Sequence, residues 1–315
     1  THEEAGRAPA AFKMIYGWVG VIGMVVMVVL ASGSGDLFLF SPDIGLHAPP
    51  DVSSGQGTGA HGTILQDSLV SPALGGRRQS FLIYLPPSYN TPQGVTKRYP
   101  TLYLLHGSPG KELDWFRAGK AGQSADTLIA LKQIPELIIV SPDGNGFERG
   151  TSEWGNSFDG RQLMETFVAR DLVQYVDAKY RTIPEAAYRG IGGLSMGGFG
   201  AANIGVHHPD VFGFVLSMGG YYRADGIIWG NSASYKRQNS PIDVLPTDKR
   251  AWKLQFYLAD GLQDQPYYTD TIQFAQELSR LHISYHLDQQ NGHHSWSLWQ
   301  IFLYKALLWL PWGTS

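Results

Sequence analysis

The sequence predicts an α/β fold with a mostly parallel central sheet and helices on both faces, preceded by an N-terminal transmembrane helix. Short apolar runs alternate with helix-like stretches over residues 63–315, an order typical of a parallel sheet. The later apolar runs are continuous, as expected for strands buried on both faces. Near the N-terminus, the segment from Met14 to Ala31 is nearly all apolar apart from its glycines.

The composition excludes several classes of protein. Of the 315 residues, 43% are hydrophobic and 16% are charged, which suits a folded core and argues against disorder. The net charge of -3 leaves no basic surplus for nucleic-acid phosphates. The chain has no cysteine, which excludes disulfides, thiolate metal sites and a cysteine nucleophile. No His-Glu-x-x-His spacing occurs, so neither a metal nor a cofactor is predicted.

The segment Met14–Ala31 reaches the lower limit for crossing a bilayer, which is roughly 17–25 residues. Arg7 and Lys13 precede it, and no further Lys or Arg follows for several tens of residues. The positive-inside rule then predicts a cytoplasmic N-terminus and an extracytoplasmic domain. The segment predicts either a retained single-pass anchor or a signal peptide whose cleavage would release a secreted protein, and a buried core helix is a third reading. The opening Thr1 is compatible with an upstream region.

Residues 1–31 thus form a predicted anchor or signal segment, and the Gly-, Ser- and Pro-rich residues 32–62 predict a linker before a domain at 63–315. Strands are predicted at 80–85, 99–107, 136–142, 188–194, 212–218, 253–259 and 283–289. Helices are predicted at 122–133, 161–180, 197–208, 267–281 and 295–310. The long polar and aromatic stretch 219–252 interrupts this alternation and predicts an insertion that walls a pocket above the sheet.

One serine lies between a predicted strand and a predicted helix, in the pentapeptide from Gly193 to Gly197. Ser195 is its centre, so the pattern is Gly-x-Ser-x-Gly. In a nucleophile elbow, a sharp turn lifts the serine hydroxyl above the sheet, and the flanking glycines let neighbouring backbones pass. The pattern predicts that Ser195 is a nucleophile.

A serine nucleophile needs a base, which is itself oriented by a carboxylate, and in this kind of fold the chain order is Ser, acid, His. Four of the later histidines fall on or beside a predicted helix or strand, where packing roles are favoured: His207, His208, His282 and His286. The loop after the last strand offers His293 and His294, and spacing alone does not choose between them. The loop after the preceding strand offers Asp260 and Asp264, of which Asp264 lies further out.

The negative oxygen of an acyl-transfer intermediate needs backbone N–H donors. The amide of Met196, just after the nucleophile, is one predicted donor. The amide of Ser108, in the loop that follows the strand at 99–107, is the second. Trp115 and Trp154, near two polar loops, are the predicted aromatic contacts for substrate.

Five stretches together resemble a known family. They are "RRQSFLIYLPPSY", "YPTLYLLHGSPG", "TFVARDLVQYVDAKYRT", "YRGIGGLSMGGFGAANIGVHHPDVFG" and "NGHHSWSLWQ". In this order they resemble the putative-esterase family of α/β-hydrolases, which includes feruloyl esterases, S-formylglutathione hydrolases and mycolyltransferases. The resemblance covers about residues 63–310.

The resemblance implies an α/β-hydrolase fold and a set of site residues. The family's His-x-Trp pattern implies His294 as the base, and its Gly-x-x-Asp pattern implies Asp264 as the acid. The amides of Ser108 and Met196 match the family's oxyanion donors. The N-terminal segment is not part of the family domain, and the insertion at 219–252 lies where the family varies, so the substrate is not implied.

The expected function is therefore a serine esterase that acts outside the cytoplasm on a small-molecule, lipid or glycan ester, through an acyl-enzyme and without a cofactor. The alternative is an envelope acyltransferase, similar to mycolyltransferases, that passes the acyl group to a sugar or lipid hydroxyl. A rival from another class is an inactive scaffold that binds glycan or protein, which the complete set of site residues argues against. The oligomeric state is left open.

Overall fold

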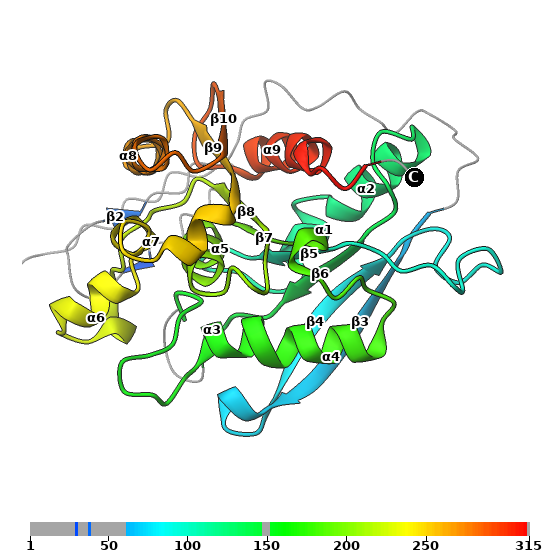
Figure 1. The fold of residues 1–315 in the computed structure, drawn as a ribbon, viewed down its shortest axis with the longest axis horizontal. Coiled ribbons are helices and arrows are strands. Elements are labelled where there is room, and N and C mark those ends of the chain that lie inside the picture. The colour runs from blue at the N-terminus through cyan, green and yellow to red at the C-terminus, as the bar shows by residue number, and fades with distance from the viewer. Residues whose placement is uncertain (1–28, 31–36, 39–60, 147–151, 314–315) are drawn as a thin grey trace, which may run out of the picture.

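The computed structural model describes residues 29–30, 37–38, 61–146 and 152–313. Among these residues, the chain forms an eight-stranded sheet in the order β10-β9-β8-β7-β5-β6-β4-β3 (Figure 1). The strands from β10 to β6 in this order run parallel, whereas β4 is antiparallel to β6 and β3 is antiparallel to β4. The strands are β3 (Thr63–Ser71), β4 (Arg77–Leu85), β5 (Thr101–Leu105), β6 (Ile138–Pro142), β7 (Arg189–Leu194), β8 (Phe214–Met218), β9 (Gln255–Gly261) and β10 (Tyr285–Gln290).

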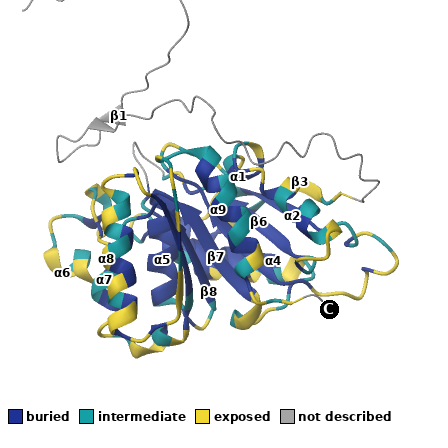
Figure 2. Ribbon diagram, turned by 90° about the horizontal axis from the view of Figure 1, so that it is seen from above, coloured by how far each residue is buried: buried dark blue, intermediate teal, exposed yellow. Residues whose placement is uncertain are grey.

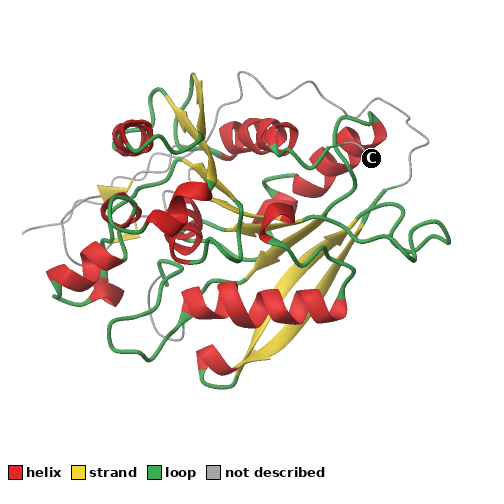
Figure 3. Cartoon of the chain, viewed as in Figure 1, coloured by secondary structure: helices red, strands yellow, loops and turns green. Residues whose placement is uncertain are grey.

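Helices cover both faces of this sheet (Figure 3). One face carries α1 (Asp114–Arg117), α2 (Ala121–Ala130) and α9 (Trp296–Trp309). The other face carries α3 (Met164–Thr166), a π-helical turn (Phe167–Leu172), α4 (Val173–Lys179), α5 (Met196–His207) and α8 (Tyr267–Arg280). The predicted α/β fold with a mostly parallel sheet is confirmed, although β3 was not predicted.

The two faces follow from the alternation of side chains along each strand. In β4, Phe81 and Ile83 belong to one apolar cluster, and Leu82 and Tyr84 belong to the other. The central strands and α5 are buried throughout, whereas the outer surfaces of the peripheral helices are exposed (Figure 2). The continuous apolar runs in the sequence therefore reflect strands covered on both sides.

The insertion at 219–252 holds two short helices, α6 (Ala233–Gln238) and α7 (Pro241–Val244). It packs on α5, because Tyr221 stacks on Phe199 with ring centroids 4.8 Å apart and Trp229 contacts the same Phe199 edge-on. The insertion is thus held against α5, the helix that directly follows Ser195.

Only part of the N-terminal predictions can be compared with the structure. Val29–Leu30 (β1) pairs antiparallel with Leu37–Phe38 (β2). The rest of the predicted membrane segment Met14–Ala31, and most of the predicted linker 32–62, lie outside the described residues. Within the described part of the chain, no helix has both the length and the apolar content that a membrane crossing requires.

A buried acidic residue joins α3 to α5. Glu165 is 6% exposed, and its carboxylate accepts hydrogen bonds from His207 Nδ1 at 3.1 Å and His208 Nε2 at 3.0 Å. Burial alone would raise the pKa of Glu165, but the two histidines outweigh it and hold the pKa at about 2. Burial opposes protonation of His207 as well, yet the Glu165 hydrogen bond raises the pKa of His207 above its ordinary value.

This cluster predicts how stability depends on pH. The depressed pKa of Glu165 stabilises the fold above pH 4.5, and this contribution is lost as the pH falls toward about 2. The raised pKa of His207 stabilises the fold below pH 6.5, and this contribution is lost as the pH rises above that value. We expect Glu165→Gln to lower the free energy of unfolding by on the order of 3 kcal/mol near pH 5.5 and by much less near pH 2.

Urea denaturation at several pH values measures this effect. The exposed Glu185 provides a matched control, because Glu185→Gln is expected to leave the profile of the free energy of unfolding against pH unchanged. A constant loss at every pH in Glu165→Gln would contradict the ionic origin of the contribution.

Candidate active site

Four loops meet at the carboxyl edge of the parallel strands. They follow β5, β7, β9 and β10, and they carry Ser108, Ser195, Asp264 and His294. Because parallel strands end at the same edge, residues far apart in the sequence come together there. All the predicted chemical groups therefore lie at one end of the sheet.

Ser195 occupies a sharp turn between β7 and α5. Its φ of 53° and ψ of -121° are unusual for a residue with a side chain. The two flanking glycines are required by close backbone contacts, because a Cβ on Gly193 would lie 2.3 Å from the Gly197 oxygen and one on Gly197 would lie 2.2 Å from the Leu105 oxygen. The Gly-x-Ser-x-Gly pattern thus forms the strand–turn–helix that the sequence predicted.

The histidine loop and the aspartate loop are joined by a hydrogen bond. His294 Nδ1 donates to Asp264 Oδ2 at 2.7 Å, and this carboxylate is 4% exposed. With Nδ1 as the donor, Nε2 is the basic nitrogen of His294. His293 is exposed, and its Nδ1 lies 3.2 Å from the Gln263 carbonyl oxygen. The structure therefore brings His294, rather than His293, to Asp264.

The His294 ring is held from several sides. Tyr267 stacks on it with ring centroids 4.4 Å apart, and Trp299 packs edge-on at 4.7 Å. Gly219, at the end of β8, has a φ of +56°, and a Cβ there would lie 3.2 Å from both His294 Nδ1 and Asp264 Oδ2. Sequence reasoning did not predict the roles of Tyr267, Trp299 and Gly219. The available signal was that Tyr267 follows Asp264 closely in the sequence and that Trp299 follows His294 closely.

Asp260, the other candidate acid, lies behind Asp264 and is fully buried. It accepts hydrogen bonds from the Thr271 hydroxyl and the Gly261 amide, each at 2.8 Å. Burial, together with the negative charge of Asp264, raises the pKa of Asp260 well above its ordinary value. Asp260 therefore holds a proton more readily than an ordinary aspartate does.

The loop after β5 is fixed by a buried histidine. His106 Nδ1 lies 2.7 Å from the Gly107 carbonyl oxygen, and its Nε2 accepts the Gly144 amide at 2.9 Å. Gly107 lies against the elbow, since a Cβ there would be 3.5 Å from the Ser195 Cβ. The next residue, Ser108, lines the same pocket as Ser195.

Met196 begins α5, directly after Ser195. Its amide is one of the N–H groups that a helix N-terminus leaves without an intrahelical acceptor. The Ser108 and Met196 positions thus both border Ser195, one from the β5 loop and one from the elbow helix.

Trp115 and Trp154 do not contact the pocket, so their predicted role in substrate binding is corrected. Both side chains are fully buried. The indole N–H of Trp115 donates to the Leu105 carbonyl at 2.9 Å, and that of Trp154 donates to the His106 carbonyl at 3.0 Å. The two tryptophans support the backbone that leads into the Ser108 loop.

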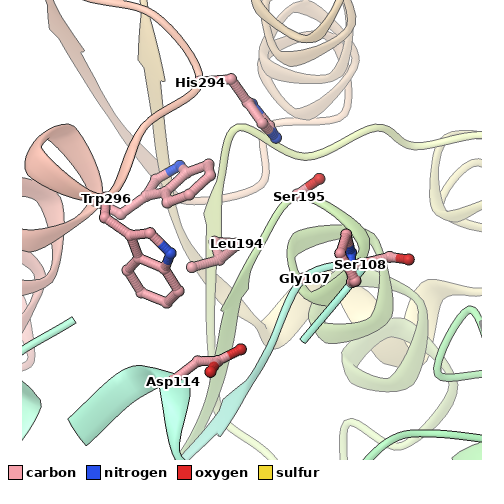
Figure 4. A pocket seen from close by; sticks show the side chains of 9 residues that line it. Gly107, Ser108, Asp114, Leu194, Ser195, His294 and Trp296 are labelled. Carbon is pink, nitrogen blue, oxygen red and sulfur yellow. The ribbon is translucent and has the colours of Figure 1, made fainter. Parts of the chain in front are cut away.

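A small pocket of about 40 Å³ opens beside Ser195 (Figure 4). Figure 4 shows the His294 imidazole directed toward the Ser195 hydroxyl, and Trp296 on the side of the pocket away from Ser108. The pocket is lined by Gly107, Ser108, Pro109, Asp114, Leu194, Ser195, His294, Trp296 and Trp299. This volume is well below the roughly 300–1,000 Å³ of a typical ligand pocket.

Sequence comparisons find relatives whose names include the word esterase. The chain is 34% identical over 171 residues to an endo-1,4-beta-xylanase/feruloyl esterase of Xylanibacter ruminicola, covering 53% of this chain and 23% of that protein. It is 36% identical over 157 residues to an esterase of Mycobacterium tuberculosis, covering 48% of this chain and 32% of that protein. The chain thus spans less than half the length of these curated relatives.

Structural comparisons agree with this result. A ferulic acid esterase superposes with a TM-score of 0.69 and 27% identity, covering 79% of this chain and 97% of that chain. An S-formylglutathione hydrolase from Agrobacterium tumefaciens has the same TM-score of 0.69 at 18% identity, covering 82% and 98%, and shows the shared fold.

The family described as "Putative esterase" matches residues 71–310, which is most of the chain. The sheet, the elbow and the relatives agree with this match. The chain belongs to the putative-esterase family, and its described domain has the α/β-hydrolase fold.

Proposed function

We propose that this esterase hydrolyses short-chain carboxylic esters through a covalent acyl-enzyme on Ser195, with His294 as the base and Asp264 as the acid. The observation that carries the proposal is the 2.7 Å hydrogen bond between His294 and Asp264, next to a serine held in an elbow. A buried carboxylate on Nδ1 fixes the tautomer and stabilises the imidazolium that forms during reaction.

The reaction proceeds in two steps. His294 Nε2 takes the proton of Ser195 as Oγ attacks the ester carbonyl carbon, and the Ser108 and Met196 amides bind the resulting oxyanion. The carbon–alkoxy bond then breaks, and His294 returns the proton to the departing alcohol. In the second step water gives its proton to His294, attacks the acyl-enzyme and releases the carboxylic acid and Ser195.

The pocket supports a short acyl group. Its volume of about 40 Å³ and its indole walls, Trp296 and Trp299, match an acetyl-sized group rather than a long chain. A chain that extends toward Trp299 would have to displace it, because Trp299 is 4% exposed and packed in the core.

A series of p-nitrophenyl esters, from acetate to palmitate, tests this function. We expect kcat/KM to be highest for acetate and to fall by about tenfold or more by octanoate, since even one misfitting methylene costs about 1–3 kcal/mol. Glycerol or trehalose is expected to have no accelerating effect.

The opposite result would favour the alternative function. Slow hydrolysis that improves with chain length and is accelerated by an added hydroxyl acceptor would indicate an acyltransferase. This alternative uses the same acyl-enzyme, which a sugar or lipid hydroxyl would then attack in place of water.

The action outside the cytoplasm stays a prediction from the sequence. It rests on the apolar segment Met14–Ala31 and the basic residues before it. Labelling of intact cells with a fluorophosphonate that does not cross membranes would test it, and labelling only after lysis would contradict it.

A further inference from the structure

A tyrosine that the proposed mechanism does not use lies against its central groups. Tyr267 is the first residue of α8 and follows the Asp264 loop. Its ring stacks on His294 with centroids 4.4 Å apart and planes 19° apart. Its hydroxyl lies within hydrogen-bonding range of the Ser195 side chain. The phenol therefore reaches the place where Ser195 and His294 meet.

The surroundings of Tyr267 keep its hydroxyl protonated. Burial and the negative charge of Asp264 raise the pKa of Tyr267 to about 12. The neighbouring Tyr221, with its ring centroid 6.3 Å away, donates its own hydroxyl to the Glu153 carboxylate. Tyr267 is therefore a hydrogen-bond donor at neutral pH, and Tyr221 is engaged elsewhere.

The tetrahedral intermediate on Ser195 limits what this donor can contact. Besides Oγ, the central carbon carries three groups: the oxyanion, the acyl chain and the alkoxy oxygen. The oxyanion is directed to the amides of Ser108 and Met196, and the acyl group occupies the pocket walled by Leu194, Trp296 and Trp299. Tyr267 does not line that pocket. The alkoxy oxygen remains, and it must lie near His294, which gives it a proton.

We propose that Tyr267 donates a hydrogen bond to the leaving alcohol oxygen and thereby adapts the site to esters of weakly acidic alcohols, such as alkyl and sugar hydroxyls. This inference rests on the proposed roles of Ser195 and His294. As the carbon–alkoxy bond breaks, its electron pair passes to the alkoxy oxygen, and the His294 imidazolium supplies the proton. Tyr267 keeps its proton and stabilises the charge that builds on that oxygen.

The variant Tyr267→Phe tests the proposal, because it keeps the ring stacked on His294 and removes only the hydroxyl. Its kcat/KM is measured on p-nitrophenyl, phenyl and ethyl acetate, which share an acyl group and differ in the acidity of the alcohol. We expect a loss within about twofold on the p-nitrophenyl ester, whose leaving group needs little help. On the ethyl ester we expect a loss of about 10- to 100-fold, the value of a hydrogen bond to a charged oxygen.

Tyr268→Phe is the matched control, since the Tyr268 hydroxyl accepts a hydrogen bond from Gln289 Nε2 at 2.6 Å. It is expected to behave like the wild type on all three esters. The rate of each variant on p-nitrophenyl acetate also reports how much folded enzyme is present. The proposal is therefore tested by the ratio of kcat/KM between the esters.

Equal losses on all three esters, or no loss on any, would overturn the proposal, because a tyrosine that only holds His294 in place would not distinguish between alcohols. Failure of the underlying mechanism would look different. In that case Ser195→Ala would keep its turnover of p-nitrophenyl acetate, whatever Tyr267→Phe does.

Discussion

Replacing Ser195 by alanine is expected to lower kcat for ester hydrolysis by about 10⁴- to 10⁶-fold. In the proposed mechanism the variant removes the oxygen that forms the acyl-enzyme, and neither His294 nor the oxyanion amides can supply another. The side chain of alanine is no larger than that of serine, so it fits the elbow between Gly193 and Gly197. Hydrolysis of p-nitrophenyl acetate measures the loss, and a fluorophosphonate probe should no longer label the protein.

Ser279→Ala is the control for this experiment, because Ser279 is exposed on α8. It should label and turn over like the wild type. If Ser195→Ala kept its labelling, another residue would be the nucleophile. If the wild type itself were not labelled, the inactive-scaffold alternative would gain support.

His294→Ala is expected to reduce kcat by a factor comparable to that for Ser195→Ala, because the two residues act as a unit in the proposed mechanism. His293→Ala is expected to keep activity within about twofold, as is usual for an exposed side chain away from the chemistry. His293 and His294 make a matched comparison, because of the two only His294 forms a hydrogen bond with the buried Asp264. Steady-state kinetics on p-nitrophenyl acetate, together with thermal melts of both variants, separate lost chemistry from lost folding.

The reverse pattern would move the role of base to His293. Activity retained in both variants would show that this loop does not provide the base at all. Either result would also remove the reason for assigning Asp264 as the acid.

Much of the fold could be predicted because strands that are buried on both faces give continuous apolar runs in the sequence. The strands β4, β5, β6 and β8 contain continuous apolar runs, and the elbow glycines around Ser195 mark a turn that only small residues allow. The residues of β3 carry no such signal. Its first half is exposed, and its apolar residues form only two short pairs, Ile64–Leu65 and Leu69–Val70, so its place at the sheet edge depends on pairing with β4 rather than on its own pattern.

The parts of the site that were missed depend on contacts between distant segments. A tryptophan in a polar loop predicts an exposed aromatic, yet Trp154 is buried because its indole reaches the His106 carbonyl. The stacking of Tyr267 on His294 likewise requires knowing how α8 is placed beside the last loop. Sequence spacing gives the order of such groups but not the direction of each side chain.

The charge of the pocket beside Ser195 affects the release of the product in the proposed reaction. Of the described residues that line it, Asp114 is acidic, and none is lysine or arginine. A neutral ester enters such a space without electrostatic cost, but hydrolysis converts it into a carboxylate anion of the same sign as Asp114. The acid is therefore repelled from the place where it was made. We therefore expect product release to be favoured, inhibition by accumulated acid to be weak, and esters whose acyl part already carries a carboxylate to be poor substrates.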